Sequence, residues 1–183
     1  MQVLDTEIPD LKVVKPDVFT DARGYFYESF NSEEFRRHGL PTGWVQDNQS
    51  ASVFGVIRGL HYQLEPHAQS KLVRVLEGAV YDVAVDLRST SPAFGQWFGM
   101  ELSDKNQLML LIPKGFAHGF SVISPRAVVL YKCDMLYARE SERGIKYNDT
   151  HLKIDWHIPA SDIKLSEKDS KLPALPEAEM NFK

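Results

Sequence analysis

Short apolar runs alternate with polar positions along most of the chain, and this two-residue period is typical of half-buried β-strands. Clusters of Gly, Pro, Asn and Asp separate the runs, as expected for turns between strands. The pattern predicts about nine strand segments, over residues 11–19, 24–30, 43–52, 56–64, 71–87, 97–102, 108–113, 119–124 and 127–137. Many short strands at this spacing predict a sandwich or a barrel.

One helix is predicted over residues 31–39. Asn31 or Ser32 is a suitable N-cap, acidic residues fill the first turn, basic residues fill the last turn, and Gly39 ends the segment. The final segment, 160–183, is polar and contains prolines, which indicates a short helix followed by an extended tail. We therefore expect a single domain over residues 1–183 with a C-terminal extension from about residue 160.

Residues 71–87 have the pattern of a β-hairpin. If Glu77 and Gly78 form a two-residue turn, Lys71 opposes Ala84, and Asp82 is a diagonal neighbour of Lys71 on a face lined by small apolar side chains. Two interpretations follow. The pair is either a cross-strand ion pair on a solvated surface, or a lysine inside the mouth of a barrel that an acid holds in place.

Composition narrows the functional classes. The chain has 183 residues, 43% of them hydrophobic and 25% charged, which is typical of a globular protein. A net charge of −4 with no basic block argues against nucleic-acid binding, although a few local arginines could still bind an anionic ligand. Cys133 is the only cysteine, so no intrachain disulfide can form. The N-terminus lacks the features of a signal peptide and no apolar run approaches the roughly 18 residues of a membrane span, so we expect a cytoplasmic protein without membrane contact.

Two histidines carry the candidate chemistry. The stretches "GVIRGLH" (55–61) and "PKGFAH" (113–118) resemble the two motifs of cupins, which are small jelly-roll barrels. Metal-binding cupins have a second histidine two residues after the first, where this chain has Gln63. Because His61 and His118 alone make a poor transition-metal site, we expect no metal and favour acid–base chemistry. The alternative for either residue is a histidine satisfied within the core.

Longer motifs identify a family. The stretches "FTDARGYFYESFN" (19–31), "VQDNQSAS" (45–52), "IRGLHYQ" (57–63), "IPKGFAHGF" (112–120) and "LSEKD" (165–169), with others between residues 5 and 175, resemble the dTDP-4-dehydrorhamnose 3,5-epimerase family. The resemblance implies an all-β cupin jelly roll with a few short peripheral helices, acting as a homodimer without a cofactor. It also implies a dTDP-sugar substrate, dTDP-4-dehydro-6-deoxy-D-glucose, inverted at C3 and C5 in dTDP-rhamnose biosynthesis for cell-surface polysaccharides.

The resemblance assigns the catalytic roles. An epimerase that works beside a ketone needs a base, a group that stabilises the enolate oxygen, and a proton donor on the opposite face. By resemblance, His61 is the base and Asp169 its carboxylate partner. Lys71 corresponds to the lysine near the ketone, with Asp82 as its support, and Tyr131 matches the tyrosine that returns a proton.

The remaining matched residues are expected to bind the nucleotide sugar. Arg23 and Arg58 suit the diphosphate, because a guanidinium binds phosphate through two hydrogen bonds. Whether each arginine serves its own subunit or the partner stays open. His118 is expected beside the sugar. The other expected contacts are Glu28, Gln46 and Asn48 to thymine or sugar hydroxyls, and Phe26 or Tyr137 stacked on the base.

Two details qualify this assignment. Arg58 and His61 point to opposite faces of a regular strand, so Gly59 between them is expected to mark a bulge that re-aims one of them. Residues 131–145 depart from the family pattern, since Met135 and Leu136 replace polar or aromatic residues and a proline is missing. This loop is expected near the nucleotide base.

Three rival functions remain at this stage. A relative could epimerise only C3 or only C5 of a related sugar. A cupin could be a metal-dependent oxygenase or isomerase, or a carbohydrate-binding protein without activity. We also expect the N-terminal strand to join the partner subunit's sheet, because this would cover an open edge.

Overall fold

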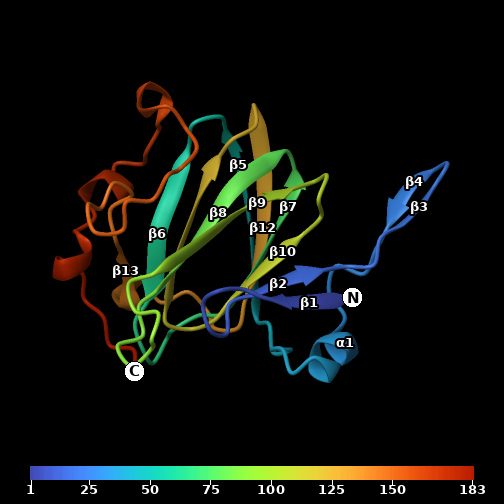
Figure 1. Ribbon diagram of the computed structural model, residues 1–183, viewed down its shortest axis with the longest axis horizontal. Helices are drawn as coiled ribbons and strands as arrows, with labels where there is room; N and C mark the ends of the chain where they lie inside the picture. The colour runs from blue at the N-terminus through green and yellow to red at the C-terminus, as the bar shows by residue number, and fades with distance from the viewer.

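Two antiparallel sheets face each other in the computed structural model, which describes residues 1–183 (Figure 1). The six-stranded sheet has the order β1 (Gln2–Asp5), β2 (Lys12–Lys15), β10 (Met109–Ile112), β7 (Lys71–Glu77), β12 (Arg126–Cys133) and β5 (Gln46–Val53). The five-stranded sheet has the order β13 (Glu142–Gly144), β6 (Ile57–Gln63), β11 (Phe116–Val122), β8 (Ala79–Asp86) and β9 (Trp97–Ser103). Most neighbouring strands are distant in sequence, and the two sheets enclose a common core. This arrangement is a jelly-roll barrel.

The main core fills the space between the sheets. Its buried side chains come from the six-stranded sheet, such as Val73 and Leu110, and from the five-stranded sheet, such as Ala84 and Phe120. Each predicted strand segment overlaps a strand of the structure. The pattern missed the short strands β1, β3 (Phe19–Asp21) and β13, because three or four residues give too little periodicity to detect.

The segment 71–87 is not a hairpin, and this prediction was wrong. Strand β7 pairs with β10 and β12, whereas β8 pairs with β11 and β9. Gly78 carries the chain from one sheet to the other with a φ of +76°, and an added Cβ would lie 2.0 Å from the carbonyl oxygen of Arg126. The predicted apolar face was nevertheless right, since Val73 and Ala84 both belong to the core between the sheets.

Helix α1 (Ser32–Arg37) confirms the helix predicted over residues 31–39. The Asn31 side-chain oxygen accepts hydrogen bonds from the backbone N–H groups of Glu33 and Glu34, at 3.0 and 3.3 Å, which satisfies two donors that a helix start leaves free. Phe35 is buried beneath the six-stranded sheet's strands β2 and β10, in a small cluster with Val14 and Met109.

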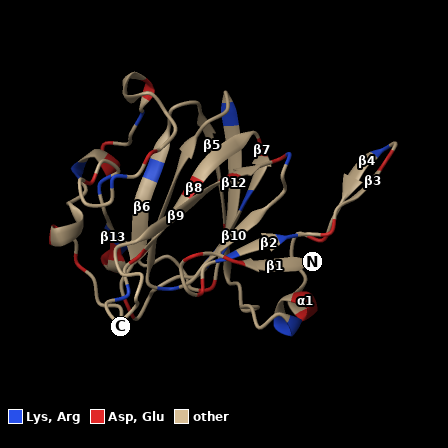
Figure 2. Ribbon diagram, in the orientation of Figure 1, with Lys and Arg blue, Asp and Glu red and all other residues tan.

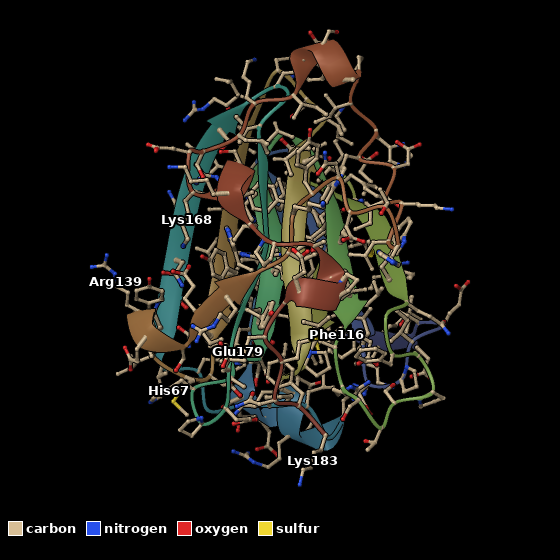
Figure 3. The ribbon with its side chains drawn as sticks, turned by 90° about the vertical axis from the view of Figure 1, so that its left-hand side faces the viewer. His67, Phe116, Arg139, Lys168, Glu179 and Lys183 are labelled. Carbon is tan, nitrogen blue, oxygen red and sulfur yellow. The ribbon has the colours of Figure 1, made fainter.

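The C-terminal segment crosses the outside of the five-stranded sheet (Figure 3). Instead of the predicted short helix, it forms the 3₁₀ turns η2 (Ala160–Asp162), η3 (Asp169–Lys171) and η4 (Leu175–Glu177). Phe182 belongs to a second core cluster that includes Ile57 and Val85, and Leu165 packs against this cluster. The single turn η1 (Arg139–Ser141) precedes β13.

A small two-stranded hairpin, β3 with β4 (Gly24–Phe26), projects away from the barrel at the right of Figure 1. Charged residues of both signs are spread over strands and loops without a block of one sign (Figure 2). None of the helices is long and apolar enough to cross a membrane.

Candidate active site

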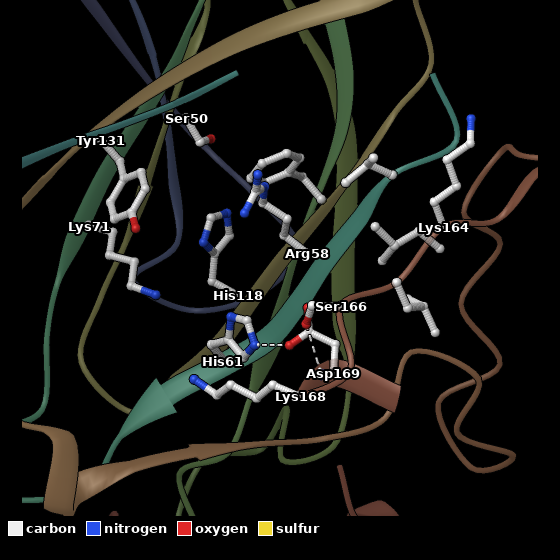
Figure 4. Close-up of a pocket in the computed structure, with 14 residues that line it drawn as sticks. Ser50, Arg58, His61, Lys71, His118, Tyr131, Lys164, Ser166, Lys168 and Asp169 are labelled. Atoms are coloured by element: carbon white, nitrogen blue, oxygen red, sulfur yellow. Dashed lines mark hydrogen bonds and ion pairs between the residues drawn. The ribbon is translucent and has the colours of Figure 1, made fainter. Parts of the chain in front are cut away.

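A cavity of about 450 Å³ lies between the two sheets beside the first half of β6 (Figure 4). The six-stranded sheet contributes Ser50, Lys71 and Tyr131 to its wall. The five-stranded sheet and the C-terminal segment contribute the rest, namely Val56, Ile57, Arg58, His61, His118, Phe120, Lys164, Leu165, Ser166, Lys168 and Asp169. A second cavity of about 280 Å³ adjoins it, because His61, Lys71 and Tyr131 line both.

His61 and Asp169 meet across the chain. The His61 Nε2 atom lies 2.6 Å from Asp169 Oδ1, and the Asp169 side chain is only 5% exposed. In the neutral imidazole, Nε2 donates to the carboxylate and Nδ1 keeps its lone pair. Burial by itself raises the pKa of the Asp169 carboxyl, but the hydrogen bond and charge of His61 outweigh it and hold the pKa below its usual value.

Gly59 does mark the expected bulge. On β11, two steps separate His118 and Phe120, whereas their partners His61 and Arg58 on β6 are three steps apart. Gly59 has a φ of +112°, which side chains disfavour, and an added Cβ would lie 2.6 Å from the His118 carbonyl oxygen. The extra residue puts both Arg58 and His61 on the cavity wall.

Asp82 does not hold Lys71 through an ion pair, which corrects the expected support. Its fully buried carboxylate contacts His118 Nε2 through both oxygens, at 3.0 and 3.1 Å. Burial lowers the pKa of the His118 imidazole, and Lys71 and His61 lower it further, while Asp82 opposes them. The neutral His118 ring therefore donates from Nε2 to Asp82. This pairing was missed because the assumed hairpin placed Asp82 beside Lys71 instead of across the barrel from it.

Lys71 and Tyr131 form the opposite wall. The Lys71 Nζ atom lies 5.9 Å from the centroid of the Tyr131 ring, and the two side chains come from the adjacent strands β7 and β12. Burial lowers the pKa of the Lys71 ammonium, although Cys133, Asp82 and Glu142 oppose this shift. Burial also raises the pKa of the Tyr131 phenol, so the hydroxyl stays protonated at neutral pH.

Three basic side chains, Arg58, Lys164 and Lys168, line the main cavity at separate points of its wall (Figure 4). Arg58 donates from Nε to the Ser52 hydroxyl at 3.1 Å. Lys164 and Lys168 were not predicted, although Lys168 directly precedes Asp169 in the "LSEKD" motif and could have been found there. Figure 4 shows Lys164 and Lys168 entering from the C-terminal segment, on the same side as Asp169.

The adjoining cavity brings together the predicted base-binding residues Gln46, Asn48 and Tyr137. The Tyr137 backbone N–H donates to Gln46 Oε1 at 2.9 Å, and Gln46 Nε2 donates to Asn48 Oδ1 at 3.0 Å. Glu142, which was not predicted, accepts from the Tyr137 hydroxyl at 2.7 Å and pairs with Lys168 at 2.5 Å. In the segment 131–145, which differs from the family pattern, the Leu136 side chain lies in solvent and is 61% exposed.

Three of the predicted substrate-binding residues line neither cavity of this chain. Arg23 lies between β3 and β4 and pairs with Asp21. Phe26 ends β4 with 68% of its surface exposed, and Glu28 accepts from the side chain of Asn31. All three residues lie on the projecting hairpin or just after it, away from His61 of the same subunit.

Metal-binding geometry is missing from the site. No three or more His, Cys, Asp or Glu side chains are grouped to hold an ion. The Nε2 atom of each histidine is already paired with a carboxylate, that of His61 with Asp169 and that of His118 with Asp82. The expected independence from metals and cofactors stays a prediction.

Comparisons with known proteins extend this picture. The family model described as dTDP-4-dehydrorhamnose 3,5-epimerase matches residues 5–177. A dTDP-4-dehydrorhamnose 3,5-epimerase of Shigella flexneri is 51% identical over 92% of this chain and 93% of its own length. The crystal structure of the same enzyme from Elizabethkingia anophelis superposes with a TM-score of 0.93 at 52% identity, covering 97% of both chains.

A third relative carries a sugar nucleotide. The 3,5-epimerase structure from Legionella pneumophila, solved in complex with dTDP-4-keto-L-rhamnose, has a TM-score of 0.92 at 47% identity over 96% of this chain and 93% of that one. Fold and site therefore define a cupin-type isomerase. Within that class, the chain belongs to the dTDP-4-dehydrorhamnose 3,5-epimerase family, as its motifs predicted.

Proposed function

We propose that the protein inverts C3 and C5 of dTDP-4-dehydro-6-deoxy-D-glucose to give dTDP-4-dehydro-L-rhamnose, by proton transfer through an enolate and without a cofactor. The observation that carries the proposal is the hydrogen-bonded pair of His61 and Asp169 on the wall of a cavity that Lys71 and Tyr131 also line. These are the base, the oxyanion stabiliser and the acid that the reaction needs.

In the first step, His61 takes a proton from the carbon beside the ketone. Because Nε2 is engaged with Asp169, the accepting atom is Nδ1. The imidazole becomes an imidazolium, and the Asp169 carboxylate, ionised at neutral pH because its pKa is lowered, stabilises the new charge.

The electron pair left on carbon moves to the ketone oxygen and gives an enolate. Lys71 supplies a positive charge for this oxygen from the opposite wall. Buried surroundings strengthen such an interaction, because fewer water molecules screen the charges than in solution.

The second step delivers a proton to the other face of the same carbon. His61 comes from β6 in the five-stranded sheet and Tyr131 from β12 in the six-stranded sheet, so the two groups face the cavity from different sides. Tyr131 then donates its phenolic proton, and the carbon leaves with inverted configuration. Exchange with solvent restores both groups for the next inversion.

Substrate binding follows the two cavities. Arg58 suits the diphosphate, with Lys164 and Lys168 adding positive charge elsewhere on the cavity wall, because cationic donors bind phosphate oxygens strongly. The polar wall of Gln46, Asn48 and Tyr137 suits the nucleoside. His118 borders the sugar between them, and its Nδ1 lone pair is an acceptor for a sugar hydroxyl.

The working unit proposed here is a homodimer. Phe19, Tyr25 and Phe26 on the projecting hairpin are 67%, 59% and 68% exposed, a large apolar surface for a short element. Covering this hairpin with a second subunit would bring the partner's Arg23, Phe26 and Glu28 towards a cavity they cannot reach within one chain.

The direct test is incubation with dTDP-4-keto-6-deoxyglucose in D₂O, with the product analysed by NMR. We expect deuterium at both C3 and C5 and proton couplings of the inverted sugar. His61→Ala should abolish incorporation, whereas His38→Ala, at an exposed histidine outside both cavities, should not. A single deuteron with one inverted centre would favour a C3-only or C5-only epimerase.

The same assay separates the remaining rivals. Activity that is lost on chelation and restored by a transition metal would indicate a metal-dependent cupin. Folded protein that binds the sugar nucleotide but gives neither exchange nor inversion would indicate a binding protein without activity.

A further inference from the structure

Residues 162–169, termed here the C-terminal strap, close one side of the main cavity (Figure 4). The strap supplies Asp169 and four further lining residues, Lys164, Leu165, Ser166 and Lys168. It belongs to neither sheet, so its position must be set by contacts of its own. Because Asp169 must stay within hydrogen-bond distance of His61, those contacts set the geometry of the catalytic pair.

The first contact is a parallel β-bridge between Val56 and Lys164. The Lys164 N–H donates to the Gly55 carbonyl at 2.8 Å, and the Ile57 N–H donates to the Lys164 carbonyl at 3.0 Å. The Lys164 ammonium adds a hydrogen bond to the Phe54 carbonyl at 2.8 Å. These bonds fix the register of the strap against the start of β6, the strand that carries His61.

Gly55 allows this close approach. Its φ is +88°, and an added Cβ would lie 2.1 Å from the carbonyl oxygen of Asp162. Real Cβ atoms do not come so close to backbone, so any side chain at this position must push the strap away from β6.

The second contact lies within the strap. The Ser166 hydroxyl accepts a hydrogen bond from the Asp169 N–H at 3.0 Å, and the Ser166 carbonyl accepts from the Ser170 N–H at 3.1 Å. Ser166 thereby begins the turn that presents Asp169. The second carboxylate oxygen of Asp169 faces the Gly59 N–H at 3.5 Å, next to the bulge.

We propose that Gly55 and Ser166 are positioning residues, which hold the strap so that the Asp169 carboxylate stays aligned with the His61 ring. Neither residue needs to touch the reacting carbon. A displacement of about 1 Å in a catalytic group can lower a rate by about 100-fold, so loosening either contact should affect catalysis more than substrate binding.

The kinetic test for Ser166 rests on the proposed function. We expect Ser166→Ala to lower kcat by about tenfold or more while KM changes by less than about twofold. Ser166→Thr keeps the hydroxyl and should restore most of kcat. A variant series that raises KM with unchanged kcat would show instead that Ser166 contacts the substrate directly, and would overturn its positioning role.

Gly55 has a matched control in Gly95. Both have a positive φ, +88° and +75°, but an added Cβ at Gly95 meets no atom within 4 Å. We therefore expect Gly55→Ala to lower kcat strongly and Gly95→Ala to leave it close to wild type. Equal effects of the two substitutions would mean that backbone strain, and not displacement of the strap, is responsible.

A spectroscopic test needs no turnover. ¹⁵N shifts of the His61 ring nitrogens, assigned by their loss in His61→Gln, report which nitrogen carries the proton. In wild type and Ser166→Thr the proton should reside on Nε2, whereas Ser166→Ala and Gly55→Ala should give a mixture of tautomers. Wild-type ring shifts in both of the latter variants would overturn the proposal, even if the proposed substrate were wrong.

Discussion

At the scale of single residues, the site places an ionised carboxylate and a protonated phenol around the same cavity. The pKa of Asp169 is lowered by its pairing with His61, so the residue is a carboxylate, whereas burial raises the pKa of Tyr131, so the residue is a neutral acid. A charged partner for the base and a protonated donor can therefore coexist at neutral pH. This separation is what an enolate mechanism needs on the two faces of the substrate.

Tyr131→Phe removes the donor and leaves the base. In D₂O we expect this variant to exchange the substrate C–H for deuterium through His61 while inversion slows by about 100-fold or more. Proton NMR of recovered substrate and product measures both rates. Loss of exchange and inversion in equal measure would show that Tyr131 does more than return the proton.

The Asp169 carboxylate also links stability to pH. Since its pKa in the folded protein lies below the unfolded value of about 3.9, its stabilising contribution is present above that value and is lost as the pH falls through the folded pKa. We expect Asp169→Asn to be less stable than wild type at neutral pH, and its stability to fall less steeply below about pH 4.

Urea unfolding at a series of pH values measures this difference. Glu7→Gln is the control, because Glu7 is exposed and makes no hydrogen bond or ion pair. Parallel pH curves for wild type and Asp169→Asn would show that the His61–Asp169 contact makes no difference to acid stability.

At the scale of elements, β6 is the strand around which the site is arranged. Its bulge at Gly59 aims both Arg58 and His61 into the cavity, and its start receives the C-terminal strap. A regular strand could deliver only alternate residues to one face. The irregular geometry of β6 is thus what allows one strand to present both Arg58, proposed here to bind phosphate, and His61, the proposed base, to the same cavity.

Gly59→Ala tests the bulge. The new Cβ would meet the His118 carbonyl and the Gly119 Cα at 2.6 and 2.7 Å, and the backbone conformation is unfavourable for alanine. We expect a loss of about 1–3 kcal/mol in the free energy of unfolding, measured with urea, and a large loss of activity. Gly39→Ala is the control, because Gly39 has a φ of +69° with open space around it. A stable, fully active Gly59→Ala would contradict this interpretation.

At the scale of the whole molecule, the barrel builds its site from segments that are far apart in sequence. His61 and Asp169 are 108 residues apart, and His118 and Asp82 are 36 residues apart. The hairpin that carries Arg23 lies outside this arrangement. In the homodimer proposed above, these hairpin residues would act at the partner subunit's site.

Subunit complementation tests this arrangement. Arg23→Ala and His61→Ala each inactivate every site of their own homodimer if both residues are essential. If Arg23 serves the partner subunit, refolding an equal mixture should restore about a quarter of wild-type activity, because each mixed dimer regains one intact site. No recovery, with mixed dimers verified by mass spectrometry, would place Arg23 in its own subunit's site.

The sequence by itself determined the local features. Alternation located the strand segments, Asn31 and the charges around it located the helix, and Gly59 marked the bulge, because each of these depends on a residue and its near neighbours. Family motifs brought His61 and Asp169 together before any geometry was known. Lys168, inside one of those motifs, could have been included.

Only the tertiary structure decided which strands pair and which side chains meet. The run 71–87 has the pattern of a hairpin, yet its halves lie in different sheets, and Asp82 contacts His118 instead of Lys71. Alternation specifies which face of a strand is buried, but not against what it packs. The partner of each strand is selected by the packing energy of the whole barrel. That energy cannot be read from any single segment of the sequence.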